Sequence, residues 1–542
     1  MSRFPASQTA GAEDHSSFAE TIGVSFVGPA VILTGAFIAS RVVGLARDVA
    51  ITAEFGTSLD YDLWAAAFRL PDTIFNLLAG GALGSALIPV FARTLAESKR
   101  TALWRLSSAV GSLIVLVSGL AALALVVFAP RLTVIFPGFT GAEAERLVGL
   151  VRILALSPVL FALGEVTRRS LNTLQHFLAP ALGLVLYNAA ILVAALTVAR
   201  GDSGVSGLAV GAVIGAGLYV LIQVPALIAR DARYTPRLGL RDTDVLDIVR
   251  LMGPRLIGQG VVHLNILLTA SIASVLPDGR LSALNYAWQL MMLPLGIFGM
   301  SLADAIFPTF ASLAARGRSE VLGRTSGQML GLVLFLTVPA AVGLAIAGRP
   351  FVTTLYERGA FSAESTALTA AALSWYALGL PAHAALEILT RSFFALHDTR
   401  TPVVVGVIAM VSYVALALLL VGRLEHVALA LALSLVTTVE AAVLFVLLQR
   451  RLPGLASNDL LKSVLRTALA AGSLVIVLMI VAGVGGILPP SETAPLATLV
   501  RRVGHTLALA GLGALVYGLV AWLLGAPELA LVRARLPGKR RH

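Results

Sequence analysis

The chain has 542 residues, of which 58% are hydrophobic and only 13% are charged, and its mean hydropathy is +0.90. A soluble protein carries about a quarter charged residues, so this composition excludes a water-soluble enzyme. The absence of cysteine excludes disulfides, thiol catalysis and iron–sulfur clusters. The net charge of +11 is typical of basic loops facing anionic lipid rather than of a nucleic-acid-binding domain.

Apolar segments of membrane-spanning length recur along the whole chain. About 20 apolar residues cross the roughly 30 Å core of a bilayer, and these segments lack the two-residue alternation of a membrane barrel. They predict an all-α integral membrane protein with about 14 transmembrane helices. The predicted helices, in chain order, span residues 24–52, 62–98, 103–129, 143–174, 178–199, 206–229, 244–275, 281–314, 322–347, 364–396, 402–421, 427–449, 460–485 and 496–524. Pro71, Pro294 and the pair Gly80-Gly81 are expected to kink or loosen their helices.

Polar segments flank these helices. Residues 1–23 predict a disordered cytoplasmic tail and not a signal peptide, because no short apolar core precedes a cleavage site. Residues 525–542 predict a basic cytoplasmic tail. If both termini are cytoplasmic, the cytoplasmic connections hold 25 Lys and Arg residues and the opposite connections nine. This asymmetry predicts a multi-pass protein with both termini inside the cell.

Two sequence matches indicate an internal repeat. Residues 165–170 (Glu-Val-Thr-Arg-Arg-Ser) correspond to residues 387–392 (Glu-Ile-Leu-Thr-Arg-Ser) at an offset of 222. Residues 88–92 (Ile-Pro-Val-Phe-Ala) correspond to residues 307–311 (Phe-Pro-Thr-Phe-Ala) at an offset of 219. Repeated halves around a cavity are typical of transporters.

The repeat predicts two lobes of six helices each, because six helices return the chain to its starting side. The lobes would therefore share one orientation and be related by a pseudo-twofold axis along the membrane normal. We expect an N-lobe over residues 24–229, a C-lobe over 244–449 and two additional helices within 460–524.

Charged residues within the first two helices are the best candidates for a substrate site, because intramembrane charge is costly and usually functional. They are Arg41, Arg47 and Asp48 in the first helix and Asp62, Arg69 and Asp72 in the second. The planar fork of arginine suits phosphate, which favours a phosphorylated or pyrophosphorylated substrate. A role as interfacial anchors is the alternative for Arg41 and Arg47, although arginine anchors are disfavoured where a helix runs outward.

Other intramembrane charges leave two interpretations open. Glu165 with Arg169 and Glu387 with Arg391 occupy equivalent repeat positions, either as structural ion pairs or as a site for a coupling ion. Arg255 follows Gly253-Pro254, an expected helix break, and is a further candidate for substrate binding.

We expect no metal site and no cofactor, and the sequence leaves open whether a cation is coupled to transport. A Walker A loop, an HExxH motif and a nucleophile elbow are all absent, which argues against an enzyme and against ATP hydrolysis by the chain itself.

Seven short motifs are distributed along the chain, at residues 40–48 (Ser-Arg-Val-Val-Gly-Leu-Ala-Arg-Asp), 68–71 (Phe-Arg-Leu-Pro), 88–92, 252–254 (Met-Gly-Pro), 293–299 (Leu-Pro-Leu-Gly-Ile-Phe-Gly), 355–361 (Leu-Tyr-Glu-Arg-Gly-Ala-Phe) and 395–402 (Ala-Leu-His-Asp-Thr-Arg-Thr-Pro). Together they resemble the motifs of the MurJ/MviN family, the bacterial lipid II flippases of the MOP exporter superfamily. The resemblance implies a bacterial inner-membrane location and a central cavity for the headgroup of lipid II. It also implies that the last two helices form a groove for the polyprenyl tail, and it makes cell-wall synthesis proteins possible partners.

The resemblance also assigns residues one by one. The basic and acidic positions of the first two helices in the family fall on Arg41, Arg47, Asp48, Asp62 and Arg69. Two positions at which the family has arginine are Phe75 and Gln289 in this chain. This departure leaves two possibilities, namely lipid II bound through a different set that includes Arg69 or Arg255, or a diverged substrate.

Three functions are therefore considered. The first is a flippase that moves lipid II from the inner to the outer leaflet by alternating access. The second is a MOP-type exporter of another lipid-linked saccharide or of a small solute. The third is a membrane scaffold without transport activity whose substrate site has decayed.

Overall fold

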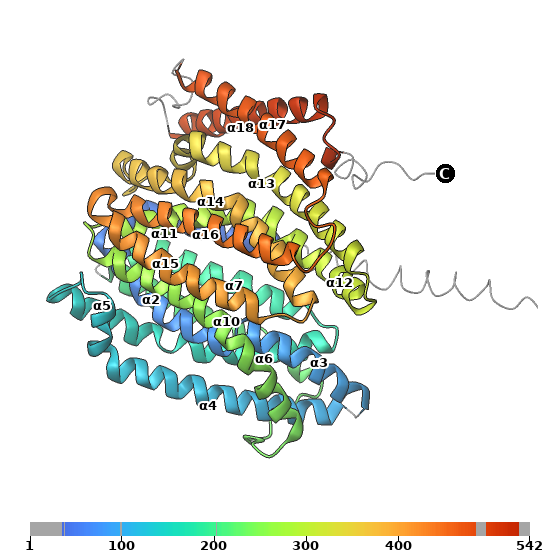
Figure 1. The fold of residues 1–542 in the computed structure, drawn as a ribbon. Coiled ribbons are helices and arrows are strands. Elements are labelled where there is room, and N and C mark those ends of the chain that lie inside the picture. The colour runs from blue at the N-terminus through green and yellow to red at the C-terminus, as the bar shows by residue number, and fades with distance from the viewer. Residues whose placement is uncertain (1–34, 37, 98–99, 202, 484–494, 530–542) are drawn as a thin grey trace, which may run out of the picture. The chain divides into compact units, whose positions relative to one another are not determined.

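The computed structural model describes residues 35–36, 38–97, 100–201, 203–483 and 495–529, and every regular element in these ranges is a helix (Figure 1). The predicted all-α class is confirmed. The predicted tail at residues 1–23 lies outside the described residues, as do residues 530–542 of the predicted basic tail.

The described helices follow the predicted segments closely, because long apolar runs have no stable alternative to helix in a bilayer. Residues 38–55 form the first described helix. It is followed by α2 (Leu59–Leu78), α3 (Gly81–Glu97), α4 (Arg100–Leu132), η1 (Thr133–Ile135), α5 (Ala142–Leu154), α6 (Ser157–Thr173), α7 (Leu178–Leu196), η2 (Val198–Arg200), α8 (Gly204–Leu221) and α9 (Val224–Ile228).

The second half of the chain continues with longer helices. These are α10 (Thr243–Ser274), α11 (Arg280–Pro294), η3 (Leu295–Met300), α12 (Ser301–Ala315), α13 (Ser319–Tyr356), α14 (Ala363–Ala395), α15 (Arg400–Leu424), α16 (His426–Gln449), α17 (Asn458–Gly483) and α18 (Pro495–Leu523). Among the described residues, ten helical stretches are long and apolar enough to cross a membrane. The chain is therefore a multi-pass membrane protein, and the count of fourteen stays a prediction.

Helix breaks occur at two of the positions that the sequence singled out. The chain leaves helical geometry between α2 and α3, where a Cβ atom on Gly80 would come within 2.6 Å of the Asn76 carbonyl oxygen. After Pro294 the six residues of η3 form a π-helical segment, a feature often found at functional sites. The break expected at Gly253-Pro254 was wrong, because α10 runs through these residues without interruption.

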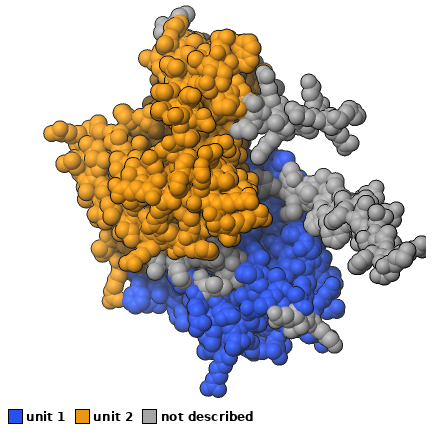
Figure 2. All heavy atoms as spheres, turned by 45° about the vertical axis from the view of Figure 1, so that its right-hand side comes forward, with its two compact units in different colours: residues 1–51, 70–129, 149–256 blue, residues 52–69, 130–148, 257–542 orange. Residues whose placement is uncertain are grey.

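The chain divides into two compact units, coloured separately in Figure 2. Unit 1 comprises Met1–Ile51, Leu70–Ala129 and Gly149–Leu256, and unit 2 comprises Thr52–Arg69, Pro130–Val148 and Ile257–His542. Within unit 2, α14 packs against α13 and α16, and α17 and α18 pack against α13 (Figure 1). The lobe boundaries expected from the repeat stay a prediction.

The repeat is visible in local structure within each unit. Gln175 and His397, 222 positions apart, follow α6 and α14 and share a left-handed backbone with φ of 58°. The residues after them close equivalent turns, with backbone N–H donors at 176 and 398 bonding to carbonyl oxygens at 171 and 393. The two segments thus share a sequence motif and the backbone conformation of the turn that ends it.

Side-chain hydrogen bonds repeat as well. The hydroxyl groups of Ser107 and Ser170 lie 2.8 Å apart in unit 1, and those of Ser326 and Ser392 lie 3.1 Å apart in unit 2. These pairs join corresponding helices at offsets of 219 and 222, the same two offsets as the sequence matches.

Candidate functional site

Arg47 is held by a polar cluster within unit 1. Its Nε and Nη2 donate to Asp48 Oδ1 at 2.9 and 2.6 Å, and its Nη1 donates to Asn188 Oδ1 on α7 at 2.7 Å. The side chains of Arg47 and Asp48 are 24% and 21% exposed, so the ion pair is not sealed in the interior. The guanidinium is oriented and still accessible, an arrangement that suits recognition of a phosphate oxygen.

Asn188 was not predicted from the sequence. It is a single polar residue in the apolar helix α7, and such residues often satisfy only local bonds. Its Nδ2 does donate to the carbonyl oxygen of Leu184 at 3.0 Å, while its Oδ1 accepts from Arg47. The signal that could have found it is the polar side chain inside a span.

Arg41 and Arg255 lie on helices of the same unit. Arg41 is exposed on the helix over residues 38–55, six positions before Arg47. Arg255 lies in α10, and its side chain is outside the described part of the structure. Substrate binding by both residues stays a prediction.

Asp62 lies on α2, and its side chain caps the N-terminus of α11 within unit 2. Its Oδ2 accepts from the Gly279 backbone N–H at 2.6 Å, and its Oδ1 accepts from the Ser282 backbone N–H at 2.7 Å and from the Ser282 hydroxyl. Gly279 has a φ of 81°, which glycine adopts without strain. Since the carboxylate is 4% exposed and both oxygens bind α11, the geometry supports a capping role, and substrate binding by Asp62 stays an untested prediction.

Arg69 lines a cavity of about 390 Å³ inside unit 2. Its lining is mainly apolar but includes several polar groups, and we call it the polar cavity. Arg69 Nη2 donates to Asn285 Oδ1 on α11. The cavity walls come from α10, α11, η3, α14, α15 and α16, and they include Trp288, Glu387 and Glu440. Arg69 and Glu387, which are far apart in sequence, therefore line the same cavity.

Glu165 is the centre of a buried cluster in unit 1. It accepts from Arg168 at 2.8 and 2.5 Å and from the Tyr219 hydroxyl at 2.9 Å, while Arg169 lies 3.5 Å away. The predicted pair with Arg169 is present, but the shorter bonds come from Arg168. Tyr219 lies on α8, so the cluster joins two helices.

Glu387 is the repeat counterpart of Glu165 and has a different environment. Arg391 donates to Glu387 and also to Asp304 Oδ1 at 2.7 Å. Arg391 therefore has a second carboxylate as a partner, and Glu387 borders the polar cavity. A coupling role for either glutamate stays untested.

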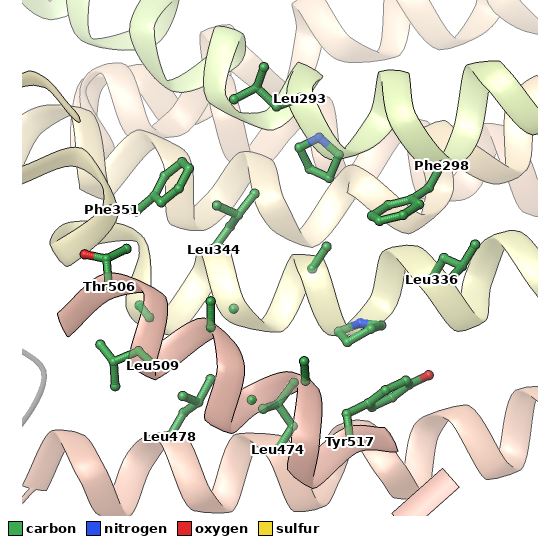
Figure 3. A pocket seen from close by; sticks show the side chains of 18 of the residues that line it. Leu293, Phe298, Leu336, Leu344, Phe351, Leu474, Leu478, Thr506, Leu509 and Tyr517 are labelled. Carbon is green, nitrogen blue, oxygen red and sulfur yellow. The ribbon is translucent and has the colours of Figure 1, made fainter. Parts of the chain in front are cut away.

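A second cavity in unit 2, of about 580 Å³, is almost entirely apolar (Figure 3). Side chains from α11, η3, α13, α17 and α18 line it, among them Leu293, Phe298, Leu344 and Leu509, with the Tyr517 hydroxyl turned to the Phe335 carbonyl oxygen at 2.8 Å (Figure 3). Helix α11 and η3 line both cavities, with Leu293 and Phe298 facing the apolar one and Trp288 the polar one. The two cavities together could hold an amphipathic molecule.

The two positions that lack the family arginines are integrated into the packing. The Phe75 ring lies 5.2 Å from the Phe161 ring in the core of unit 1. Gln289 Oε1 on α11 is buried and accepts no hydrogen bond among the described residues. In the same described ranges, no group of three or more His, Cys, Asp or Glu side chains is arranged to hold a metal ion.

Comparison with known proteins gives consistent matches. A family model described as "Lipid II flippase MurJ" matches residues 51–491. The probable lipid II flippase MurJ of Rhizobium meliloti is 32% identical over 526 residues, covering 94% of this chain and 96% of the relative. The protein of the same description from Rhizobium tropici is 30% identical, covering 95% and 98% of the two chains.

Solved structures match the fold. A lipid II flippase MurJ in an inward closed conformation aligns with a TM-score of 0.69 at 22% identity, covering 89% of this chain and 99% of that one. An inward-facing multidrug resistance MATE family transporter of the MOP superfamily aligns with a TM-score of 0.64 at 16% identity, covering 76% and 94%. At these identities the likeness concerns the fold alone.

Proposed function

The chain belongs to the MurJ family of lipid II flippases, and we propose that it moves lipid II from the inner to the outer leaflet of a bacterial inner membrane by alternating access. It is a transporter and not an enzyme. Both termini would lie in the cytoplasm, as the distribution of basic residues indicates.

The observation that carries this proposal is the pair of cavities on α11 and η3. A lipid-linked saccharide has a long apolar tail and a polar headgroup, and these need different surroundings. The apolar cavity of about 580 Å³ suits part of a prenyl chain, and the polar cavity of about 390 Å³ suits part of the headgroup. A small water-soluble solute would gain no favourable contacts in the apolar cavity.

The pyrophosphate would be bound by arginine. Arg47 presents a guanidinium that Asp48 and Asn188 orient without burying it. Arg41 lies on the same helix and is exposed. Because charge-assisted bonds from arginine to phosphate are strong and directional, these residues support an anionic lipid substrate.

We expect Arg41→Ala and Arg47→Ala each to abolish transport while the amount of protein in the membrane stays near that of the wild type. Depletion of the host flippase with complementation by each variant measures function, and quantification in isolated membranes measures abundance. Arg152→Ala is the matched control, because Arg152 is an exposed arginine of the same unit whose Nε bonds only weakly, at 3.4 Å, to the Val126 carbonyl oxygen. Full complementation by both variants would refute the assignment of the site.

A second candidate is export of a different lipid-linked saccharide. Phe75 and Gln289 stand where the resemblance implies arginine, and Phe75 is packed in a core rather than free to bind an anion. Transport of lipid II and of another undecaprenyl-pyrophosphate-linked sugar by purified protein in vesicles distinguishes the two candidates.

A further inference from the structure

The polar cavity of unit 2 has the size and composition of a small-molecule site. Its volume of about 390 Å³ lies within the range of roughly 300–1,000 Å³ that is typical of such sites. Its walls are mainly apolar and also carry hydrogen-bonding groups and aromatic rings, among them Asn265, Asn285, Thr437, Glu440, Trp288 and Tyr413.

Trp288 is held in one orientation on the cavity wall. Its ring lies 5.5 Å from the Tyr376 ring at 70° and 5.5 Å from the His383 ring at 80°. Two edge-to-face contacts of this kind restrict the indole, because each favours a perpendicular arrangement. A restricted aromatic ring on a cavity wall is a suitable surface for a flat ligand face.

Glu440 has an unmet hydrogen-bonding capacity at the same cavity. It lies within α16 and makes no hydrogen bond or ion pair among the described residues. A carboxylate inside a membrane span is costly unless it gains a partner. By contrast, the cavity groups Thr269 and Tyr413 are paired with each other at 2.8 Å. Asn285 accepts from Arg69 through its amide oxygen, and this bond does not use its amide nitrogen.

Two residues that line this cavity have different counterparts in unit 1. At an offset of 222, His383 corresponds to Phe161 and Glu440 corresponds to Leu218. In unit 1 the Phe161 ring contacts Phe75, Tyr187 and Tyr219 at centroid distances of 5.2, 4.8 and 5.7 Å. Phe161 thus packs among aromatic rings in unit 1, whereas its counterpart His383 lines the cavity of unit 2.

We propose that this cavity is a subsite for one sugar ring of the lipid-linked headgroup, with Trp288 as the stacking surface and Glu440 and Asn285 as hydrogen-bonding partners of its hydroxyl or amide groups. The proposal rests on the proposed function. A pyranose ring has an apolar C–H face and a polar rim, which match an aromatic wall with polar neighbours. A metal ion is a poorer match, because the described residues offer no cluster of three ligating His, Cys, Asp or Glu side chains.

The place of the cavity agrees with such a ligand. Helix α11 carries Trp288 on the polar side and Leu293 on the apolar side, where the prenyl chain is proposed to lie. A lipid-linked sugar could therefore bind around one helix with each part in a suitable medium.

The test compares two lipids on the purified full-length protein in nanodiscs. One probe is lipid II, and the other is undecaprenyl pyrophosphate, which lacks the sugars. Trp288→Ala and Glu440→Gln should each weaken lipid II binding by about tenfold and change undecaprenyl pyrophosphate binding by less than about twofold. Trp288→Phe, which keeps an aromatic face, should recover most of the affinity for lipid II. Trp522→Ala, at a tryptophan that is 57% exposed on α18, is the control and should change neither affinity.

The outcomes separate this proposal from the proposed function. Equal weakening of both lipids by Trp288→Ala would overturn the sugar subsite, because the loss would then not depend on the sugars. Unchanged lipid II affinity in Trp288→Ala and Glu440→Gln would overturn it as well, while leaving the flippase proposal intact. If the wild type bound neither lipid, the proposed function itself would fail.

Discussion

Several charged side chains of this chain have structural roles that depend on contacts with residues distant in sequence. Asp62 is the clearest case. The sequence singled it out as an intramembrane charge, and in the structure its side chain, on α2, caps the N-terminus of α11. A carboxylate there satisfies backbone N–H groups that have no partner within the helix and interacts favourably with the helix dipole. The cost of its burial is thereby offset.

Asp62→Ala should destabilise the folded protein by about 1–2 kcal/mol through loss of the cap, with the backbone N–H groups of Gly279 and Ser282 left buried and unpaired. The melting temperature of the purified protein in detergent measures this change. Asp60→Ala serves as the control, because Asp60 is 41% exposed and paired with Arg146 at the surface, and its loss should have little effect. A smaller shift for Asp62→Ala than for Asp60→Ala would contradict the capping role.

The two repeat glutamates should respond differently to the same change. Glu165→Gln should lower folded abundance strongly, because Glu165 is 7% exposed and its carboxylate is the negative charge that neutralises Arg168 and Arg169. Glu387→Gln should have a smaller effect on abundance, since Arg391 retains Asp304. Abundance of each variant in membranes is compared with transport per molecule. A normally abundant Glu387→Gln variant that no longer responds to an ion gradient would instead indicate ion coupling.

At the scale of elements, the sequence predicted helix positions well and partners poorly. Hydropathy predicts the helices because backbone groups within a bilayer must form their hydrogen bonds inside the helix. Gly80 and Pro294 correctly predicted two interruptions of regular α-helix. Asn188 and Trp288 were missed, because which face of a helix meets which neighbour depends on tertiary packing. The hydrogen bond from Tyr219 to Glu165 was missed for the same reason, because Tyr219 lies 54 positions later in the chain.

The connection between α14 and α15 offers a pH-dependent test of element stability. Burial raises the pKa of Asp398, but hydrogen bonds from Thr401 and the ion pair with Arg451 outweigh burial and hold the pKa below its ordinary value of 3.8. A lowered pKa in the folded state means that the stabilisation is present above the unfolded pKa and is lost as pH falls through the folded pKa. As the pH is lowered below about 4, the melting temperature of the wild type should therefore fall. The Asp398→Asn variant should be less stable than the wild type at pH 7, and its melting temperature should fall less over the same pH range. Parallel curves for the wild type and the variant would contradict this assignment.

At the scale of the whole molecule, the last two helices are attached to the rest of unit 2 near both ends. Arg502 lies 3.2 Å from Glu357, and the hydroxyl groups of Thr354 and Thr506 lie 2.7 Å apart. Toward the other end, the Tyr517 hydroxyl of α18 donates to the Phe335 carbonyl oxygen of α13 at 2.8 Å. The Ser463 hydroxyl of α17 donates to Glu528, after α18, at 2.5 Å. These bonds, together with the apolar core of α13, α17 and α18, make this pair a stable wall of the apolar cavity.

The driving force is the remaining property of the whole molecule, and the sequence contains no ATP-binding loop to supply it. A pyrophosphate-linked headgroup is anionic, and a bacterial interior is electrically negative. Outward movement of net negative charge is therefore favoured by about 2.3 kcal/mol per elementary charge per 100 mV. The same potential pulls an empty site with net positive charge inward, which would help to reset the carrier. Asp48 neutralises Arg47, so this force would have to act on another cation such as Arg41. If the arginines moved outward together with the lipid, or a cation were exported with it, the gain in free energy from the potential would be smaller.

We expect transport to accelerate with an inside-negative potential and to slow when the potential is dissipated. Transport rate in vesicles should be measured against an imposed potassium diffusion potential at constant pH and sodium concentration, with the Arg47→Ala protein as the inactive control. A rate that does not depend on the potential would refute electrical driving and would favour an electroneutral, ion-exchanging cycle.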